Sequence, residues 1–259
     1  MDTPVTVICM KWGSMYGPEY VNHLREGVAR HLKRAHRFVC FTDDASGLRP
    51  DVEVQPLPAL GLPGGHQDKR WQKLALFRRD LGGLSGTALF LDLDLVIVDS
   101  LDPFFELPGE FFIIRDDDLF RPKPLRKLEN AERDRFLATV GNSSVFRYTI
   151  GAHAYILDAY LADPAGATQQ YRLSQQFQSA QLAKHGHLHY WPRDWCVSFK
   201  NQCVPRHLRS FFADPALPAG ARIVVFAGNP KMSEVLAGGG QRWYRRIGNT
   251  DWLRAAWKG

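Results

Sequence analysis

Short apolar runs alternate with segments of helical spacing through about the first 100 residues, and this alternation limits the possible fold more than any other feature. Apolar residues recur every three or four positions from Val21 to Leu32, after Pro18, which favours a helix. The same spacing predicts a second helix over 70–81. The β-rich apolar runs are 5–10, 38–42, 52–57 and 88–98. Strands that alternate with helices predict an α/β fold, with a mostly parallel central sheet flanked by helices.

The second half of the sequence is less regular but contains the same kinds of element. Further strands are predicted at 111–115, 143–150, 188–192 and 222–228, and a helix over about 170–184. Four aromatic residues near the C-terminus are expected to pack on the core: Trp243, Tyr244, Trp252 and Trp257. Because the sequence contains no internal repeat and no low-complexity linker, we expect a single domain over residues 1–259.

Composition narrows the class of protein. Hydrophobic residues make up 45% of the 259 positions, which is enough for a core that needs no disulfide support. The four cysteines are scattered without a zinc-binding spacing, so we expect buried free thiols and a reducing compartment. The N-terminal apolar run is too short for a signal sequence, and no stretch approaches the roughly 18 apolar residues of a membrane span. We therefore expect a cytoplasmic protein.

The formal net charge of +6 is compatible with an anionic ligand, a nucleic acid or an anionic membrane surface, and it selects none of them. Basic residues cluster locally at 30–37, 121–127 and 242–246. These clusters form no motif in which basic and aromatic residues alternate as nucleic-acid binding requires. We therefore expect no nucleic-acid partner, and at most peripheral contact with the inner face of a membrane.

Two carboxylates interrupt the apolar run ALFLDLDLVIVD at residues 88–99. An ionised carboxylate is costly to bury without a partner, so Asp92 and Asp94 are expected at the end of a strand. Parallel sheets bind ligands at the carboxyl ends of their strands. An Asp-x-Asp pair there offers hard oxygen ligands to Mg²⁺ or Mn²⁺, which usually also binds phosphate oxygens. In the structural alternative, Asp92 caps a turn and Asp94 pairs with an arginine.

Two enzyme families place an Asp-x-Asp pair at a strand end. The string DLDLV at 92–96 matches the D-x-D-x-T/V motif of the haloacid-dehalogenase-like phosphatases. In that family the motif usually ends the first strand, whereas more than 80 residues with at least two predicted strands precede it here. The downstream lysine and acidic pair of that family are also not evident. A phosphatase of this kind therefore stays the minor alternative.

The other family is the nucleotide-sugar glycosyltransferases of the GT-A fold. The sequence resembles glycosyltransferase family 8, the glycogenin-like enzymes, and related bacterial enzymes. Six segments carry the resemblance in chain order: VTVICMKWGSMYGPEYVNHLREGVARHL (5–32), KRWQKLALFR (69–78), ALFLDLDLVIVDSLDPFFE (88–106), NSSVFRY (142–148), SQQF (174–177) and VVFAGNPK (224–231). The resemblance implies one GT-A domain, with a nucleotide-binding half at 1–105 and a sugar- and acceptor-binding half at 106–259.

The resemblance also implies a role for each matched position. Asp92 and Asp94 would bind Mn²⁺ or Mg²⁺ and act in catalysis together with Gln176. The donor, a nucleotide-diphosphate sugar and by family habit a UDP-sugar, would contact Val7, Cys9, Tyr16, Lys73, Asn142, Ser143, Gln175 and Lys231. A divalent ion would stabilise the negative charge that builds on the leaving diphosphate. The acceptor would be a glycan or a lipid-linked saccharide, and transfer would retain the anomeric configuration.

Two positions depart from the family pattern. Family members commonly have a histidine metal ligand just before the G-x-x-K element, where this chain has Val225 and Ala227. The acidic residue of the family's D-Q pair aligns with Gln175. These departures leave open a degenerate module that binds a nucleotide sugar or another anion without turnover. Asp194 is a candidate for the acceptor side, and residues 116–118 would be candidates for a general base if transfer inverted the configuration.

Overall fold

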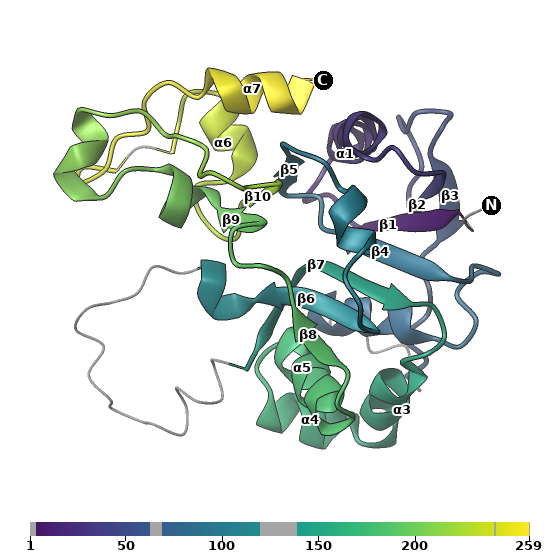
Figure 1. Ribbon diagram of the computed structural model, residues 1–259. Coiled ribbons are helices and arrows are strands. Elements are labelled where there is room, and N and C mark those ends of the chain that lie inside the picture. Colours follow the sequence, from purple (N-terminus) through teal and green to yellow (C-terminus); the bar gives the residue numbers. More distant parts are fainter. Residues whose placement is uncertain (1–3, 63–68, 120–138, 241, 259) are drawn as a thin grey trace.

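The computed structural model describes residues 4–62, 69–119, 139–240 and 242–258. Within these residues, a seven-stranded sheet in the order β3-β2-β1-β4-β7-β6-β8 forms the centre of the molecule (Figure 1). Its strands are β1 (Val5–Lys11), β2 (His36–Thr42), β3 (Glu53–Pro56), β4 (Thr87–Leu91), β6 (Phe111–Arg115), β7 (Gly141–Thr149) and β8 (Leu188–Tyr190). Of these strands only β7 runs antiparallel to its neighbours. The predicted α/β fold with a mostly parallel sheet is confirmed.

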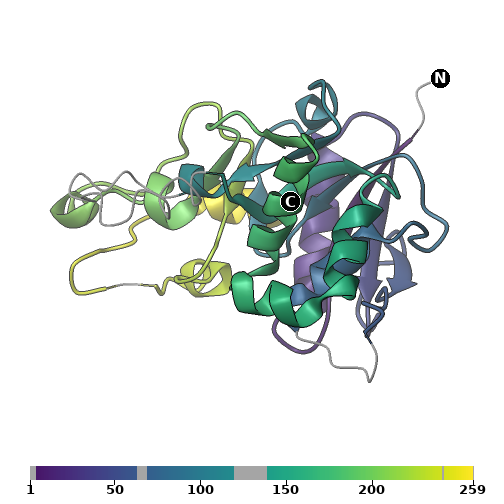
Figure 2. The same cartoon turned by 90° about the horizontal axis from the view of Figure 1, so that it is seen from below.

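Helices cover both faces of the large sheet. Helix α1 (Pro18–His31) lies on one face, and the opposite face is covered by η2 (Lys69–Phe77), α3 (Ala154–Ala162), α4 (Pro164–Gln170) and α5 (Ser174–Lys184). In Figure 2 the green helices α3 to α5 lie in front of the sheet and the purple helix α1 lies behind it. Strand β1 is apolar on both of its faces, which is why both are covered: Val7 and Cys9 pack toward α1, and Ile8 and Met10 pack toward η2.

A smaller sheet lies beside the large one, in the order β5-β10-β9. It consists of β5 (Leu95–Ile97), β9 (Cys196–Ser198) and β10 (Ile223–Val225), and the C-terminal helices α6 (Met232–Leu236) and α7 (Asp251–Lys258) pack near it. The apolar run at 88–98 is therefore divided between two sheets. Strand β4 ends at Leu91 and β5 begins at Leu95, which confirms the prediction that a strand ends at the two aspartates.

The helix predicted over 70–81 is a 3-10 helix, η2, which ends at Phe77. Its apolar residues Trp71, Leu74 and Phe77 are all buried. They are spaced three residues apart, which is the repeat of a 3-10 helix rather than the 3.6-residue repeat of an α-helix. The chain turns soon afterwards at Gly82, whose φ of +61° is a conformation that glycine adopts most easily.

Two other local predictions are corrected. The helix predicted over 170–184 begins at Ser174, because the separate helix α4 ends at Gln170. Trp243 and Tyr244 do not pack on the core, since they are 90% and 48% exposed. They lie in a tight turn between Arg242 and Arg245, whereas Trp252 and Trp257, on α7, pack against the smaller sheet as expected.

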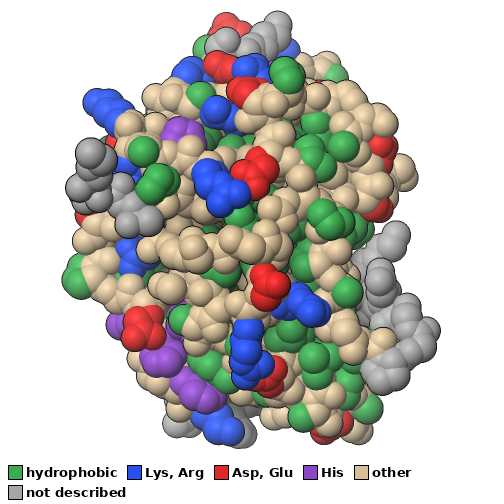
Figure 3. Space-filling model, turned by 90° about the vertical axis from the view of Figure 1, so that its right-hand side faces the viewer, with side chains coloured by type: hydrophobic (Ala, Val, Ile, Leu, Met, Phe, Trp, Pro, Cys, Tyr) green, Lys and Arg blue, Asp and Glu red, His purple; other side chains and the backbone are tan. Residues whose placement is uncertain are grey.

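All four cysteines are buried free thiols, as predicted. On the face shown in Figure 3, the described basic side chains lie beside acidic ones and form no continuous basic patch, while histidine side chains gather near its lower edge. The basic cluster at 121–127 lies outside the described residues. Among the described residues, no helix has the length and apolar character needed to cross a membrane.

Candidate active site

Asp92 and Asp94 follow β4 at the carboxyl edge of the parallel strands, and two separate parts of the chain hold their backbone. The N–H of Asp92 donates to the carbonyl of Ser144 at 2.8 Å. That carbonyl lies near the start of β7, which reaches this edge because β7 is antiparallel. After β10, the N–H of Phe226 donates to the carbonyl of Asp94 at 2.9 Å. The loop between the two sheets is thus fixed from both sides.

Lys73, on η2, provides the cation for the first carboxylate. Its Nζ lies 2.7 Å from the carboxylate of Asp92. It also donates to the backbone carbonyl of Ser143 at 3.2 Å and lies 3.4 Å from the hydroxyl of the same residue. The side chains of Lys73 and Asp92 are only 18% and 23% exposed. Because a carboxylate this buried needs a partner, the ion pair offsets the desolvation of Asp92.

Asp94 has a different environment. The hydroxyl of Tyr16 donates to its Oδ2 at 3.1 Å, so its partner is a tyrosine and not the arginine of the structural alternative. Burial, followed by the negative charge of Asp92, raises the pKa of Asp94 to about 6, although Lys73, Tyr16 and Lys231 each lower it. Lys231, which precedes α6, is therefore close enough for its charge to act on this carboxyl group.

A pocket of about 520 Å³ opens at the two aspartates. It is lined by Met10, Trp12, Gly13, Ser14, Met15, Tyr16, Arg70, Lys73, Asp92, Leu93 and Asp94. Trp12 and Tyr16 offer flat, half-buried aromatic faces on which a nucleotide base can stack. Gly13 holds the loop between them with a φ of +62°, and its N–H donates to Asp43 at 3.0 Å. The pocket thus combines an aromatic side with a charged side.

A second polar network adjoins the pocket through Ser143. The pairing of β6 with β7 is irregular between Ile113 and Ile114, which leaves the backbone of Ser143 without a β6 partner. The N–H of Ser143 instead donates to Oε1 of Gln175, on α5, at 3.3 Å. The irregularity in β7 therefore frees backbone groups for side-chain contacts at this edge.

Asp116 receives the other amide hydrogens of this network. Asn142 donates to its Oδ1 at 3.2 Å, and Gln175 donates to the same oxygen at 3.5 Å. Burial raises the pKa of Asp116, and the hydrogen bonds from Asn142 and Gln175 act in the opposite direction. From the sequence, Asp116 is predicted only as one of the candidates for a general base at 116–118, and not as a donor-binding residue. The signal for it was available, because it follows β6 directly at the same edge of the sheet.

The structure brings most of the predicted site residues together. Hydrogen bonds or ion pairs link seven of them: Tyr16, Lys73, Asp92, Asp94, Asn142, Ser143 and Gln175. The eighth, Lys231, acts on Asp94 through its charge. Val7 and Cys9 are placed elsewhere, since both are 0% exposed in the core beneath α1. Because side chains alternate along a strand, the residue of β1 that lines the pocket is Met10.

Gln176 also lies outside this network. Its Oε1 accepts hydrogen bonds from the backbone N–H groups of Arg172 and Leu173 at 3.0 and 3.3 Å. This arrangement satisfies amide groups at the beginning of α5, as a capping residue does. The catalytic role of Gln176 therefore stays a prediction, while the geometry gives it a structural one.

The residues around Asp94 suit a hard divalent cation that binds together with phosphate. The formal charges of Asp92, Asp94, Lys73 and Lys231 sum to zero, and a nucleoside diphosphate brings about two negative charges, which a divalent ion would balance. Val225 is 0% exposed and cannot reach a ligand. Asp92 and Asp94 would therefore hold Mg²⁺ or Mn²⁺, with phosphate oxygens and water as the remaining ligands.

The chain matches no protein-family model and no curated protein sequence. Its structure is similar to that of the galactosyltransferase LgtC, solved with donor and acceptor sugar analogues, with a TM-score of 0.56 and 14% identity over 87% of this chain and 88% of LgtC. It is also similar to the bifunctional glycosyltransferase WbbM without ligands, with a TM-score of 0.56 and 12% identity over 89% of this chain. The match covers 47% of WbbM, about half of that protein. These similarities confirm the predicted GT-A fold.

Proposed function

We propose that this protein transfers a sugar from a nucleotide-diphosphate sugar to a glycan or a lipid-linked saccharide. The observation that carries the proposal is the pocket at the carboxyl end of β4, where Asp92, Asp94 and Lys73 meet in a GT-A fold. The resemblance to family 8 favours a UDP-sugar and retention of the anomeric configuration. LgtC was solved with analogues of both a donor and an acceptor sugar, which supports a two-substrate reaction for a chain of this fold.

Each part of the site has a chemical task in this reaction. Trp12 and Tyr16 offer faces for stacking of the base, and Asp92 and Asp94 would hold a divalent ion that would supply positive charge for the leaving diphosphate. Lys73 and Lys231 hold the phosphates with their positive charges. The network at Asn142, Gln175 and Asp116 offers amide donors and a carboxylate acceptor for the sugar hydroxyls.

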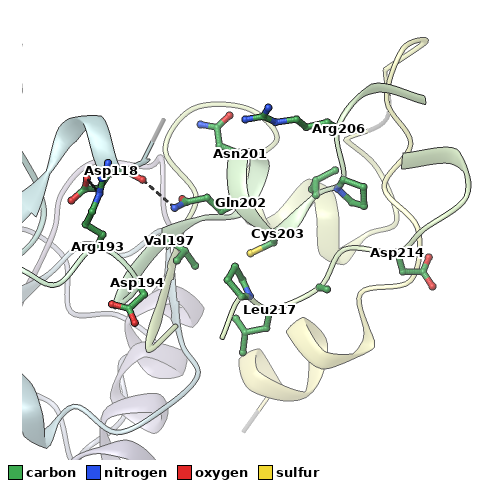
Figure 4. Close-up of a pocket in the computed structure, with 14 residues that line it drawn as sticks. Asp118, Arg193, Asp194, Val197, Asn201, Gln202, Cys203, Arg206, Asp214 and Leu217 are labelled. Atoms are coloured by element: carbon green, nitrogen blue, oxygen red, sulfur yellow. Dashed lines mark hydrogen bonds and ion pairs between the residues drawn. The ribbon is translucent and has the colours of Figure 1, made fainter. Parts of the chain in front are cut away.

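We place the acceptor in a second cavity, of about 870 Å³ (Figure 4). Charged and amide side chains line it together with the apolar Val197 and Leu217, a mixture that suits a saccharide. Asp118 and Arg193 form an ion pair of 2.7 Å on one side, and Asp214 lies on the opposite side. The short helix η4 (Asp116–Leu119) joins the two sites, because Asp116 belongs to the donor network and Asp118 to this cavity.

Asp194 lines the proposed acceptor cavity, as the prediction of an acceptor-side role requires. Replacement of Asp194 by Asn is expected to raise the KM for the acceptor by about tenfold and to leave the KM for the donor unchanged. Steady-state kinetics with each substrate varied in turn separate the two constants. A variant with unchanged turnover and unchanged KM values would remove Asp194 from the site.

We place the reaction in the cytoplasm, with at most peripheral contact between the basic surface residues and the inner face of a membrane. A lipid-linked acceptor made on that face would be reached without a membrane-spanning segment. Co-sedimentation of the protein with vesicles that contain anionic lipids, compared with neutral vesicles, measures this contact. Equal and negligible binding to both would leave a soluble glycan as the acceptor.

A binding module without turnover is the second candidate. It is favoured by the amide of Gln175 at the position of the family's acid, and by the buried Val225 at a position of its histidine. A haloacid-dehalogenase-like phosphatase is not favoured, because the Asp-x-Asp pair ends the fourth strand, β4, and not the first.

Donor hydrolysis across a panel of UDP-, GDP- and CMP-sugars, with and without Mn²⁺, distinguishes the candidates. We expect hydrolysis of one class of donor, and thermal stabilisation by its nucleotide only when metal is present. Stabilisation without hydrolysis or transfer would favour the binding module. If no nucleotide has any effect, both proposals fail.

A further inference from the structure

A second group of ligating side chains lies at the opposite, amino edge of the large sheet. Glu110 directly precedes β6 and His187 directly precedes β8, and these two strands begin in register, with Phe111 beside Leu188. His153 follows the end of β7, which lies at this edge because β7 is antiparallel. Histidine side chains gather near the lower edge of the face shown in Figure 3. Glu110, His153 and His187 do not belong to the pocket at Asp92.

The spacing of the three side chains is close to that of a metal site. One ligand atom from each of Glu110, His153 and His187 lies within 4.8 Å of the others. Nε2 of His187 is 3.6 Å from the carboxylate of Glu110. Ligands of tetrahedral Zn²⁺ are about 3.4 Å apart, given metal–ligand bonds of about 2.0–2.2 Å. The Glu110 side chain is 63% exposed, so it is free to close the remaining gap.

Tyr155 orients the two imidazole rings. Its hydroxyl lies 3.3 Å from Nδ1 of His153 and 3.1 Å from Nδ1 of His187. A hydroxyl oxygen has two lone pairs, so it can accept a hydrogen bond from both Nδ1–H groups at once. Each ring then presents an unprotonated Nε2, the form that binds a metal ion. His185 stacks on the ring of Tyr155, with 3.9 Å between centroids, and holds it in place.

An independent observation shows that this cluster lacks a partner. His153 is only 1% exposed, and its Nε2 is buried without a hydrogen-bond partner among the residues that the structure describes. Buried polar atoms in folded proteins are almost always paired, because an unpaired one carries the full cost of its desolvation. A cation on Nε2 would provide the missing interaction.

We propose that Glu110, His153 and His187 bind Zn²⁺, with water at the fourth position. Two imidazoles and one carboxylate are a ligand set typical of zinc and poorly suited to Mg²⁺ or Ca²⁺. The ion would connect the beginnings of β6 and β8 to the segment after β7. The proposal does not depend on the proposed transferase activity, because it concerns the other edge of the sheet.

The test measures Zn²⁺ binding to the full chain with Asp92→Asn and Asp94→Asn, so that no ion is bound at the carboxyl edge. Competition with a chromophoric chelator is expected to give one Zn²⁺ per chain. On this background, His187→Ala and Glu110→Gln should each lower the affinity by about 100-fold or more. The matched control is His189→Ala, which removes an exposed histidine of β8 outside the cluster and should bind as before.

A second measurement uses Co²⁺, whose visible absorption reports four-coordinate binding. Tyr155→Phe keeps all three ligands and is expected to lower the affinity by about 10–100-fold, because the rings lose their Nδ1 partner. All these variants replace partly or fully exposed side chains, and melting temperatures without metal check that they fold. Absence of stoichiometric Zn²⁺ in the parent chain, or equal affinity of the His187→Ala and His189→Ala chains, would overturn the proposal.

Discussion

The two edges of the large sheet differ in whether their buried polar groups have ion-pair or hydrogen-bond partners. At the carboxyl edge, Asp92 already pairs with Lys73 and Asp94 with Tyr16. At the amino edge, Nε2 of His153 is buried and has no hydrogen-bond partner in the described part of the chain. The first arrangement is stable without a ligand and suits a substrate that comes and goes. The second is incomplete by itself and suits an ion that stays bound. One sheet would thus support both the proposed site for turnover and the proposed site for a resident metal.

The largest effect is expected from substitutions at the carboxyl edge alone. Asp92→Asn and Asp94→Asn should each lower metal-dependent kcat/KM by at least about 100-fold, because the charge that holds the ion at the diphosphate is lost. Zn²⁺ binding at the amino edge should not change. Donor hydrolysis and chelator competition on the same preparations make the comparison. Wild-type rates in both variants would remove the central assignment of the site.

Removal of metal is expected to lower the stability of the protein through the amino edge. With Zn²⁺ at about 100 times its dissociation constant, binding contributes about 2.7 kcal/mol to the free energy of unfolding. For a chain of this size, a strong chelator should then lower the melting temperature by about 5–10 °C. In the His187→Ala chain, the chelator should have little effect. If the chelator lowers the melting temperature of this variant by the same amount, the stabilising ion is bound elsewhere.

A smaller effect is expected for the ion pair of the carboxyl edge. Lys73→Met leaves the partly buried carboxylate of Asp92 without its cation, so the free energy of unfolding should fall by about 2 kcal/mol, and nucleotide affinity by about tenfold. Arg79→Met is the matched control, because its ion pair with Asp158 is largely exposed and solvent screens it, so its loss should leave the free energy of unfolding almost unchanged. Urea titrations and nucleotide titrations of both variants measure the difference. Equal losses would show that the burial of the Lys73 pair has no energetic consequence.

The smallest effect distinguishes two neighbouring glutamines. Gln176→Ala should lower the free energy of unfolding by about 1 kcal/mol, since α5 loses its capping contacts, and should not change kcat. Gln175→Ala should weaken donor binding about threefold to tenfold with a smaller loss of stability, because Ser143 and Asp116 lose an amide partner. A large fall in kcat for Gln176→Ala at unchanged stability would instead support its predicted catalytic role.

The parts of the fold that the sequence predicted well are those set by local pattern. Strands β1, β2, β4 and β6 each contain a short apolar run, and the two closely spaced carboxylates that follow the run of β4 have few places to lie. The residue of β1 that lines the pocket is Met10, and the prediction of Val7 and Cys9 there was wrong. The difference depends on which helices cover which face of the sheet, and packing decides that. The helix predicted over 70–81 is present as η2 and only its end was wrong; its 3-10 type could not be told from a spacing of three residues, which fits both kinds of helix over a short segment.

The amino-edge cluster could not have been predicted in this way. Glu110, His153 and His187 belong to no motif and are far apart in the chain. They meet because β6 and β8 pair from their first residues, and because β7 ends beside them. Pairing between distant strands is a property of the whole sheet, and no local window of sequence contains it. Asp116 is different, because its place at the carboxyl edge follows from the end of β6, and only its contact with Asn142 depends on the irregular pairing of β6 with β7.

The ion pair between Lys73 and Asp92 also sets an order of events in the proposed reaction. Because the lysine already neutralises one carboxylate, the pocket alone attracts a divalent ion only weakly. In the proposed reaction, Asp92 and Asp94 would therefore hold the ion mainly when the diphosphate of the donor is bound, and the ion would supply positive charge for the leaving diphosphate. Turnover would follow the concentration of the metal–donor complex rather than that of either component. The metal-bound diphosphate, which satisfies the same charges, would then be a strong product inhibitor.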